Sequence, residues 1–273
     1  MAVVAARLQR QGYTIGVVPT MGALHEGHLS LIRAAAREND RVIVTIFVNP
    51  LQFGPKEDFA RYPRNPDRDL RLCQAHGADI VFSPSVEALY PTTFQTFVSV
   101  GPLAEGWEGK SRPGHFRGVA TVVAMLFHLT RPTKAYFGQK DYQQLLVVRR
   151  MVEDLCMAVE IRRVPTIREP DGLAMSSRNQ YLSALERRQA TVLYQALRLA
   201  RQRILDGERK ASPILRQMRR LIQTQPKARL DYAAIVDART LIPQERLHGR
   251  VAVLLAAWMG KTRLIDNIVV DVP

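Results

Sequence analysis

The feature that most constrains this 273-residue chain is an alternation of short apolar runs with helical patterns through its first 165 residues. Runs rich in β-branched and aromatic residues predict buried strands at residues 14–18, 41–48, 79–82 and 134–137. Apolar residues at helical spacing predict helices at residues 27–37, 66–76, 117–129 and 141–155. This alternation predicts an α/β fold in which helices cover both faces of a parallel sheet.

The pattern changes after Pro165, where a polar loop and an arginine-rich helical stretch precede three short apolar runs. These runs predict strands at residues 231–236, 251–256 and 262–266. We therefore expect a smaller α+β domain at residues 167–273, following a first domain at residues 1–166. Residues 52–65, which combine prolines, a glycine and mixed charge, are expected to form a loop over the site.

The net charge of +14 raises the possibility of a nucleic-acid partner, because lysine and arginine bind phosphate backbones. However, much of the excess lies in the arginine-rich stretch, where Leu193, Leu197, Ala200 and Ile204 recur at helical spacing. This spacing favours a helix with arginines on its solvated faces over a nucleic-acid groove. We expect no nucleic-acid partner.

Other function classes are disfavoured by what the sequence lacks. No run approaches the roughly 20 apolar residues of a membrane-spanning helix, so no membrane partner and a cytoplasmic location are expected. The two cysteines, Cys73 and Cys156, lack CxxC or zinc-ligand spacing. Both stand in expected helices, and buried free thiols are the favoured interpretation.

The first motif, VVPTMGALHEGH at residues 17–28, is typical of a strand that passes through a turn into a helix. His25 and His28 are three residues apart, so they share a face at the helix N-terminus, where phosphates bind readily. A zinc protease of the HExxH type would need the second histidine one residue later. The alternative is two ordinary surface histidines.

The second motif, FVNPLQF at residues 47–53, ends an apolar strand in polar amides and a proline. Asn49 could simply cap the turn. Gln52 has less structural reason to be there, and its amide can both donate to and accept from a hydroxy acid.

The third motif is AYFGQKDYQQ at residues 135–144, again a strand, a glycine and a helix start. Gly138 permits a close backbone approach, and Lys140 offers a charge to phosphate. Asp141 can accept from ribose hydroxyls or cap the helix. Gln144 is expected one helical turn below Lys140, on the same side.

The fourth motif, REPDGLAMSSRNQYL at residues 168–182, carries two hydroxyls and a guanidinium at Ser176, Ser177 and Arg178. This set suits the oxygens of a polyphosphate. The Asp171-Gly172 pair predicts a flexible turn that lets the loop close over a nucleotide. On composition alone, a solvated loop would be the favoured interpretation.

In their order and wording, these motifs resemble the pantothenate synthetase family over essentially the whole chain. That family belongs to the nucleotidyltransferase superfamily, which shares the His-x-x-His turn with class I aminoacyl-tRNA synthetases. The resemblance implies a Rossmann-like first domain, a smaller lid domain and a homodimer. It implies that the enzyme uses ATP with Mg²⁺ to convert pantoate into a pantoyl adenylate, which β-alanine then attacks to give pantothenate, AMP and pyrophosphate.

The resemblance also implies roles for individual residues. Catalytic roles fall on His25, His28, Lys140, Ser176, Ser177 and Arg178, with His28 as the proton donor. Contacts with ATP fall on Met21, Gly22, Ala23, Leu24, His25, Glu26, Gly27, His28, Gly138, Gln139, Lys140, Asp141, Ile167, Met175, Ser176, Ser177 and Arg178. Gln52 and Gln144 match the residues that hold pantoate, and no side chain is assigned to a metal.

The chain departs from the family pattern at Gln139, where the family usually has glutamate, so a charge beside Lys140 is lost. A rival interpretation is a nucleotidyltransferase acting on a phosphorylated small-molecule acceptor. Such an enzyme should carry an Ile-Ser-Ser/Thr-Thr loop, whereas this chain has Met-Ser-Ser-Arg-Asn at residues 175–179.

Overall fold

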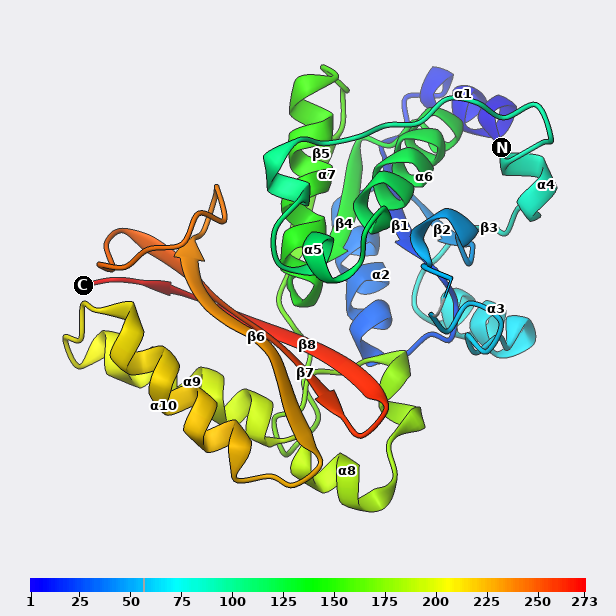
Figure 1. Cartoon of the computed structure of the whole chain (residues 1–273). Helices are drawn as coiled ribbons and strands as arrows, with labels where there is room; N and C mark the ends of the chain where they lie inside the picture. Colours follow the sequence, from blue (N-terminus) through cyan, green and yellow to red (C-terminus); the bar gives the residue numbers. More distant parts are fainter. Residues whose placement is uncertain (56) are drawn as a thin grey trace. The chain divides into compact units, whose positions relative to one another are not determined.

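The computed structural model describes residues 1–55 and 57–273, which divide into two compact units (Figure 1). Unit 1 comprises Met1–Gln139 and Gln143–Pro165, and unit 2 comprises Lys140–Tyr142 and Thr166–Pro273. In the part of the chain that the structure describes, every helix is too short or too polar to cross a membrane.

Unit 1 is built on a parallel sheet whose strands lie side by side in the order β3-β2-β1-β4-β5. Their bounds are β1 (Ile15–Thr20), β2 (Arg41–Ile46), β3 (Ile80–Phe82), β4 (Lys134–Gly138) and β5 (Glu160–Val164). The chain runs outward from β1 to β3 and then returns to the other side of β1 with β4. The strand order therefore reverses between β1 and β4, which is where such sheets bind ligands.

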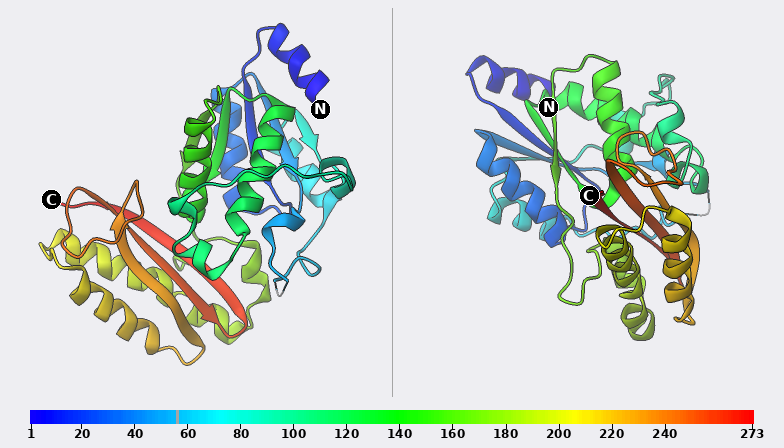
Figure 2. Two further views of the ribbon diagram at one scale, coloured as in Figure 1. Left: turned by 45° about the horizontal axis from the view of Figure 1, so that its top comes forward. Right: turned by 90° about the vertical axis from the view of Figure 1, so that its left-hand side faces the viewer.

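The helices of unit 1 join these strands (Figure 2). The α-helices are α1 (Ala2–Arg10), α2 (Glu26–Glu38), α3 (Pro66–Ala75), α4 (Val86–Leu89), α5 (Glu108–Ser111), α6 (His115–Thr130) and α7 (Tyr142–Asp154). The 3₁₀ turns are η1 (Pro50–Gln52) and η2 (Pro102–Ala104), and a further turn, η3 (Gln139–Asp141), follows β4 and passes from unit 1 into unit 2.

Alternate residues of the central strands point into different cores. On β1, Val17 packs with residues of α6 and α7, whereas its neighbour Val18 packs with residues of α2. The same alternation separates Ile43 from Val44 on β2. Because successive side chains of a strand point to opposite faces, helices cover both faces of this sheet, and the predicted α/β fold is confirmed.

Several local predictions need correction. Neither α1 nor β5 was predicted, and the pattern of β5 is polar because it forms the edge of the sheet and only partly buries its side chains.

Cys73 is buried, and burial raises the pKa of its thiol to about 11, with a further contribution from the negative charge of Asp69. Cys156 is exposed and follows the end of α7, so the expectation of a buried thiol in a helix is wrong there. The described part of the predicted 52–65 loop forms η1 at its start and then turns and bends, while Lys56 lies outside the described residues.

Unit 2 contains an antiparallel sheet in the order β6-β7-β8, with helices packed on one face (Figure 1). Its strands are β6 (Ala228–Asp237), β7 (Arg250–Met259) and β8 (Thr262–Asp271). Compared with the predicted strands, β6 and β7 are longer at both ends, and β8 is longer at its carboxyl end. Its helices are η4 (Ser177–Tyr181), α8 (Ala184–Gln189), α9 (Val192–Leu205) and α10 (Ala211–Gln223).

The arginine-rich stretch forms α9 and α10, as predicted. The stripe of Leu193, Leu197, Ala200 and Ile204 is at most 1% exposed and joins the core beneath the sheet, while Arg198, Arg201 and Arg203 are exposed. The arginines are thus the solvated faces of amphipathic helices. The predicted α+β architecture of this part is confirmed.

One close approach in unit 1 gives a stability prediction. A Cβ atom at Gly118, in α6, would lie 2.3 Å from the Leu51 carbonyl oxygen and 2.7 Å from the Gln52 nitrogen. Both are backbone atoms, so Gly118→Ala should lower the free energy of unfolding by about 1–3 kcal/mol despite the better helix propensity of alanine.

Urea unfolding of the purified protein would measure the change. Gly106→Ala is the control, because a Cβ there meets nothing within 4 Å. Equal stability of the two variants would mean that α6 does not hold η1 as closely as the structure shows.

Candidate active site

Turns from three of the sequence motifs lie at the carboxyl ends of three adjacent strands of unit 1. Met21–His25 follow β1, Asn49–Gln52 follow β2, and Gly138 ends β4. The strand order reverses between β1 and β4, and β2 is the neighbour of β1 on its other side. Three of the four sequence motifs therefore converge on the edge of the sheet where ligands bind.

The turn between β1 and α2 is held by a carboxylate that the sequence did not single out. Asp69, only 1% exposed, accepts from the backbone N–H groups of Ala23 at 2.8 Å and Leu24 at 2.9 Å. Gly22 and Ala23 both have positive φ, +78° and +50°, and alanine rarely adopts this conformation. The two hydrogen bonds stabilise this unusual backbone shape. No local motif marks Asp69, because its partners lie 45 and 46 residues away.

His25 and His28 form a reciprocal cap at the start of α2. The His25 Nδ1 atom accepts from the Gly27 N–H at 3.1 Å, and the His28 Nδ1 atom accepts from the His25 N–H at 3.3 Å. The ring centroids are 4.1 Å apart. Because each Nδ1 atom accepts, a neutral ring carries its proton on Nε2. Each ring is therefore a fixed N–H donor at a helix N-terminus, which favours phosphate over the interpretation as ordinary surface histidines.

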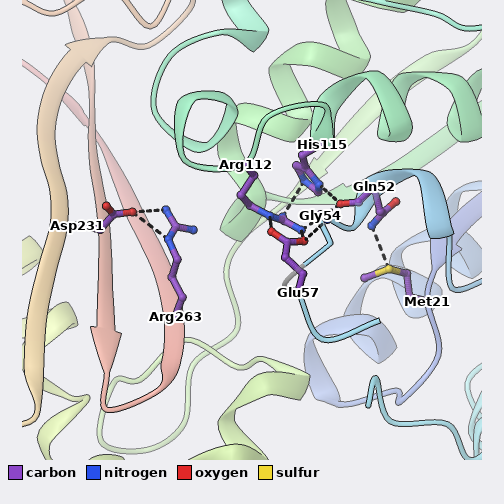
Figure 3. Close-up of polar contacts among 8 residues, drawn as sticks. All are labelled: Met21, Gln52, Gly54, Glu57, Arg112, His115, Asp231 and Arg263. Atoms are coloured by element: carbon purple, nitrogen blue, oxygen red, sulfur yellow. Dashed lines mark hydrogen bonds and ion pairs between the residues drawn. The ribbon is translucent and has the colours of Figure 1, made fainter. Parts of the chain in front are cut away.

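Gln52 is buried, at 8% exposure, and both polar atoms of its side chain make hydrogen bonds, of which Figure 3 shows the one to Met21. Its Nε2 atom donates to the Met21 sulfur at 3.0 Å, and its Oε1 atom accepts from Asn49 at 3.1 Å. Asn49 caps η1 by accepting from the Leu51 N–H, the role that the sequence allowed, and it also accepts from the Tyr90 hydroxyl at 2.8 Å. Asn49 thus orients the Gln52 amide as well as capping the turn.

The two adjacent glutamines of the third motif, Gln143 and Gln144, differ in burial. Gln143 is 4% exposed, donates to the carbonyls of Leu103 and Gly106, and accepts from the Glu108 N–H, so it has a structural role. Gln144 is only partly buried. Gln144 lies in α7, whereas Lys140 lies in the preceding turn η3, and the predicted position of Gln144 one helical turn from Lys140 stays a prediction.

In unit 2, the segment that carries Lys140 is anchored through its backbone. The Lys140 carbonyl accepts from Asn267 at 2.8 Å, and the neighbouring Tyr142 hydroxyl donates to the Ala238 carbonyl at 2.7 Å. The Lys140 Nζ atom lies 3.8 Å from the Asp141 carboxylate. The Lys140 carbonyl is thus held in place, while its ammonium group pairs with Asp141 at longer range and its charge also opposes the increase that burial causes in the pKa of Asp266.

The fourth motif lies in unit 2 and is more ordered than its composition predicted. Arg168 makes two hydrogen bonds to Asp266, at 2.6 and 2.9 Å, donates to the Gly172 carbonyl and stacks over Tyr194. Burial raises the pKa of Asp266, and Arg168 acts in the opposite direction. The expected flexible turn is thus pinned at its base by a nearly buried ion pair.

The hydroxyl-bearing end of this motif begins η4. Ser176 caps that turn by accepting from the Arg178 N–H at 3.3 Å, and Asn179 donates to the Ala174 carbonyl at 3.1 Å. Hydrogen bonds between side chains and the backbone therefore hold the segment that carries Ser176, Ser177 and Arg178. Across residues 1–55 and 57–273, no group of three or more His, Cys, Asp or Glu side chains is arranged to hold a metal ion.

The sheet order and the histidine cap define a class. A parallel sheet whose strand order reverses beside a helix N-terminus with two N–H donors is the arrangement of a Rossmann-like enzyme that binds phosphates.

Comparison with known proteins narrows this class. Residues 1–269 match the family model described as pantoate-beta-alanine ligase. A pantothenate synthetase of Moorella thermoacetica is 57% identical over 98% of this chain and 95% of its own length, and one of Roseiflexus sp. is 56% identical over 97% and 95%. The chain therefore belongs to the pantoate-β-alanine ligase family. The rival interpretation, a nucleotidyltransferase that acts on a phosphorylated small-molecule acceptor, is set aside.

Solved structures agree with the family. A pantothenate synthetase of Thermus thermophilus superposes with a TM-score of 0.92 at 51% identity, covering 97% of this chain and 96% of that chain. A pantoate-β-alanine ligase of Francisella tularensis, complexed with beta-gamma ATP and β-alanine, gives a TM-score of 0.79 at 36% identity, covering 98% and 93%. The Rossmann-like fold expected from the sequence is thereby confirmed.

The Asp69 hydrogen bonds give a prediction about the histidine turn. Asparagine at this position has one acceptor oxygen where aspartate has two, so Asp69→Asn should leave a backbone N–H of the turn without its partner. We expect the free energy of unfolding to fall by about 1–3 kcal/mol. Chemical denaturation would measure it.

Asp67→Asn serves as the control, since Asp67 is exposed in the same first turn of α3 and shares its interaction with the helix dipole. If both variants lost the same stability, the dipole rather than the turn would explain the effect.

Proposed function

We propose that this chain activates pantoate with ATP as a pantoyl adenylate and transfers the pantoyl group to β-alanine, giving pantothenate, AMP and pyrophosphate. A carboxylate and an amine do not condense unaided in water, so the reaction needs an activated acyl group. Family membership and the Francisella relative complexed with ATP and β-alanine support the substrates. The observation that carries the mechanism is the pair of oriented histidine N–H donors at the carboxyl end of β1.

In the first step, the pantoate carboxylate attacks the α-phosphorus in line, forming a C–O–P bond as the bond to pyrophosphate breaks. Negative charge builds on the phosphoryl oxygens. The Nε2–H groups of His25 and His28 are suited to stabilise that charge. The sequence predicts His28 as the proton donor, and we propose that it donates a hydrogen bond there without transferring the proton, because a neutral ring that lost its proton would become an imidazolate. A preoriented donor needs no reorganisation at the transition state.

Cationic and hydroxyl side chains would bind the leaving group. We assign Lys140, Ser176, Ser177 and Arg178 to the β- and γ-phosphates, because charge-assisted hydrogen bonds to phosphate are strong. Mg²⁺, which the family resemblance implies, would supply positive charge against the negative charge of the polyphosphate, and no side chain of this chain is assigned to hold it. The remaining ATP contacts expected from the sequence stay predictions.

We assign the pantoate site to Gln52 and Gln144, whose amides can accept from hydroxyls and donate to a carboxylate. The held orientation of Gln52 supports its part of this assignment. In the second step, the amine of β-alanine attacks the adenylate carbonyl, the C–N bond forms and AMP leaves. A homodimer, which the family resemblance implies, and a cytoplasmic location, which the apolar pattern of the sequence predicts, remain proposals.

The two-step mechanism makes a prediction about exchange. Because the adenylate forms before β-alanine is needed, labelled pyrophosphate should exchange into ATP when pantoate alone is present. Exchange would be measured with purified protein, with and without each substrate. Exchange that needed β-alanine, or that ran equally well without pantoate, would contradict an adenylate formed from pantoate.

A second prediction separates the half-reactions through Lys140. Its proposed partner leaves as pyrophosphate, so it cannot stabilise the second transition state. Lys140→Met removes the charge but keeps most of the stem. Adenylate formation should slow by about 10²-fold or more, while preformed pantoyl adenylate should react with β-alanine at a near-normal rate.

Single-turnover measurements of each step would test this. Lys134→Met is a matched control, since the Lys134 side chain is 21% exposed against 20% for Lys140 and pairs with Glu38. Equal slowing of both steps by Lys140→Met would place the lysine at the α-phosphate and overturn the division of roles.

A further inference from the structure

The main chain of Gln52 is held by a second group of side chains, separate from those that hold its amide (Figure 3). Its carbonyl oxygen accepts from His115 Nδ1 at 2.9 Å and from Arg112 Nη2 at 3.3 Å. Arg112 Nη1 also lies 3.0 Å from His115 Nε2. A guanidinium can only donate, so His115 Nε2 must accept, and the ring proton then lies on Nδ1, directed at the Gln52 carbonyl.

His115 is suited to this arrangement because it stays neutral. It is 7% exposed, and burial, followed by the positive charge of Arg112, lowers the pKa of its imidazole to about 4. At neutral pH the ring therefore keeps one acceptor and one donor nitrogen. A protonated ring would place two donors against each other at Nε2 and Arg112.

Glu57 fixes the guanidinium of Arg112 from the other side. Its carboxylate accepts from Arg112 Nε and Nη2, both at 2.7 Å, and from the Gly54 N–H at 3.3 Å. Burial disfavours the ionised carboxylate, but the hydrogen bonds and charge of Arg112 outweigh it and hold the pKa of Glu57 below its usual value. The side chains are only 14% and 26% exposed, so solvent screens this pair weakly.

We propose that Arg112 and His115 are positioning residues for pantoate, which fix the main chain of Gln52 and so direct its amide to the substrate. This inference rests on the proposed role of Gln52. Both side chains bond to the carbonyl rather than to the amide, so they act through Gln52. Glu57 supports them by fixing the plane of the guanidinium. A preoriented amide binds its substrate without first losing conformational freedom.

A control for the ion pair exists in unit 2. Arg263 Nε and Nη2 donate to Asp231 at 2.9 and 2.8 Å, and the two side chains are 15% and 28% exposed (Figure 3). This pair matches Arg112 and Glu57 in chemistry and exposure and has no proposed link to pantoate. Arg263→Lys therefore reports what the loss of such a pair does by itself.

The test measures kcat and the KM values for pantoate and ATP on the full chain. Arg112→Lys keeps the charge but cannot contact Glu57, His115 and the Gln52 carbonyl together. We expect its KM for pantoate to rise about tenfold, the effect of a lost hydrogen bond, with its KM for ATP within about twofold of normal. Arg263→Lys should leave both KM values unchanged. Equal rises for pantoate and ATP would overturn the proposal.

His115 offers a rescue experiment. His115→Phe keeps a ring but removes both hydrogen bonds, and should raise the KM for pantoate in the same way. His115→Asn can place an amide N–H near the Nδ1 position, so it should recover part of the lost pantoate affinity. If both substitutions raised the KM for pantoate equally, the donor to the Gln52 carbonyl would not matter and the proposal would fail.

A double-mutant comparison separates this inference from the proposed function. Gln52→Ala should raise the KM for pantoate, and adding Arg112→Lys should then have little further effect, because the directed amide is already gone. If Gln52→Ala left the KM for pantoate unchanged, the pantoate assignment and this inference would fail together. If Arg112→Lys raised the KM for pantoate by the same factor in the unmodified protein and in the Gln52→Ala variant, only the positioning role would be wrong.

A milder variant covers the case in which Arg112→Lys fails to fold. Glu57→Gln keeps the size of the side chain and one acceptor oxygen, so it should weaken the hold on Arg112 without removing it. We expect a smaller rise in the KM for pantoate, again without a change for ATP. No rise in a folded Glu57→Gln protein would count against the network.

Discussion

The hydrogen bonds from the Asp69 carboxylate to the Ala23 and Leu24 amides are the interaction on which the histidine turn depends. They hold a backbone with positive φ at two successive residues, so that a short turn leads from the end of β1 at Thr20 to the start of α2 at Glu26. Only with that start do His25 and His28 cap the helix and present their Nε2–H groups. The geometry proposed for phosphate binding thus depends on a residue that lies in α3, more than 40 positions along the chain from both histidines.

Gln52 is likewise held in place by surrounding residues, and by more of them than the histidine turn. Asn49 and Met21 orient its amide, Arg112 and His115 hold its carbonyl, and the backbone of η1 lies against α6 at Gly118. A glutamine on an exposed turn would sample several rotamers, and fixing one would oppose binding. In this protein, folding has already fixed the rotamer of the Gln52 side chain.

The sequence predicted the sheet well because its central strands are buried on both faces and read as continuous apolar runs, as at Val17 and Ile43. It did not predict β5, whose edge position tolerates Arg162 and Arg163, nor the exposure of Cys156. Site residues within motifs could be named, since strand, turn and helix signals are local. The supporting residues could not, because Asp69 and Arg112 reach partners 45 to 60 positions away without any periodic signal.

The short segment Lys140–Tyr142 belongs to unit 2, although the chain on either side belongs to unit 1. Unit 2 is therefore discontinuous in sequence, and a fragment that starts at Thr166 would lack part of it. In such a fragment, Asn267, which is 3% exposed, would lose the Lys140 carbonyl, and the Ala238 carbonyl would lose the Tyr142 hydroxyl. Unsatisfied buried polar groups are costly, so the carboxy-terminal part is ill suited to excision, circular permutation at this junction or recombination with another ligase.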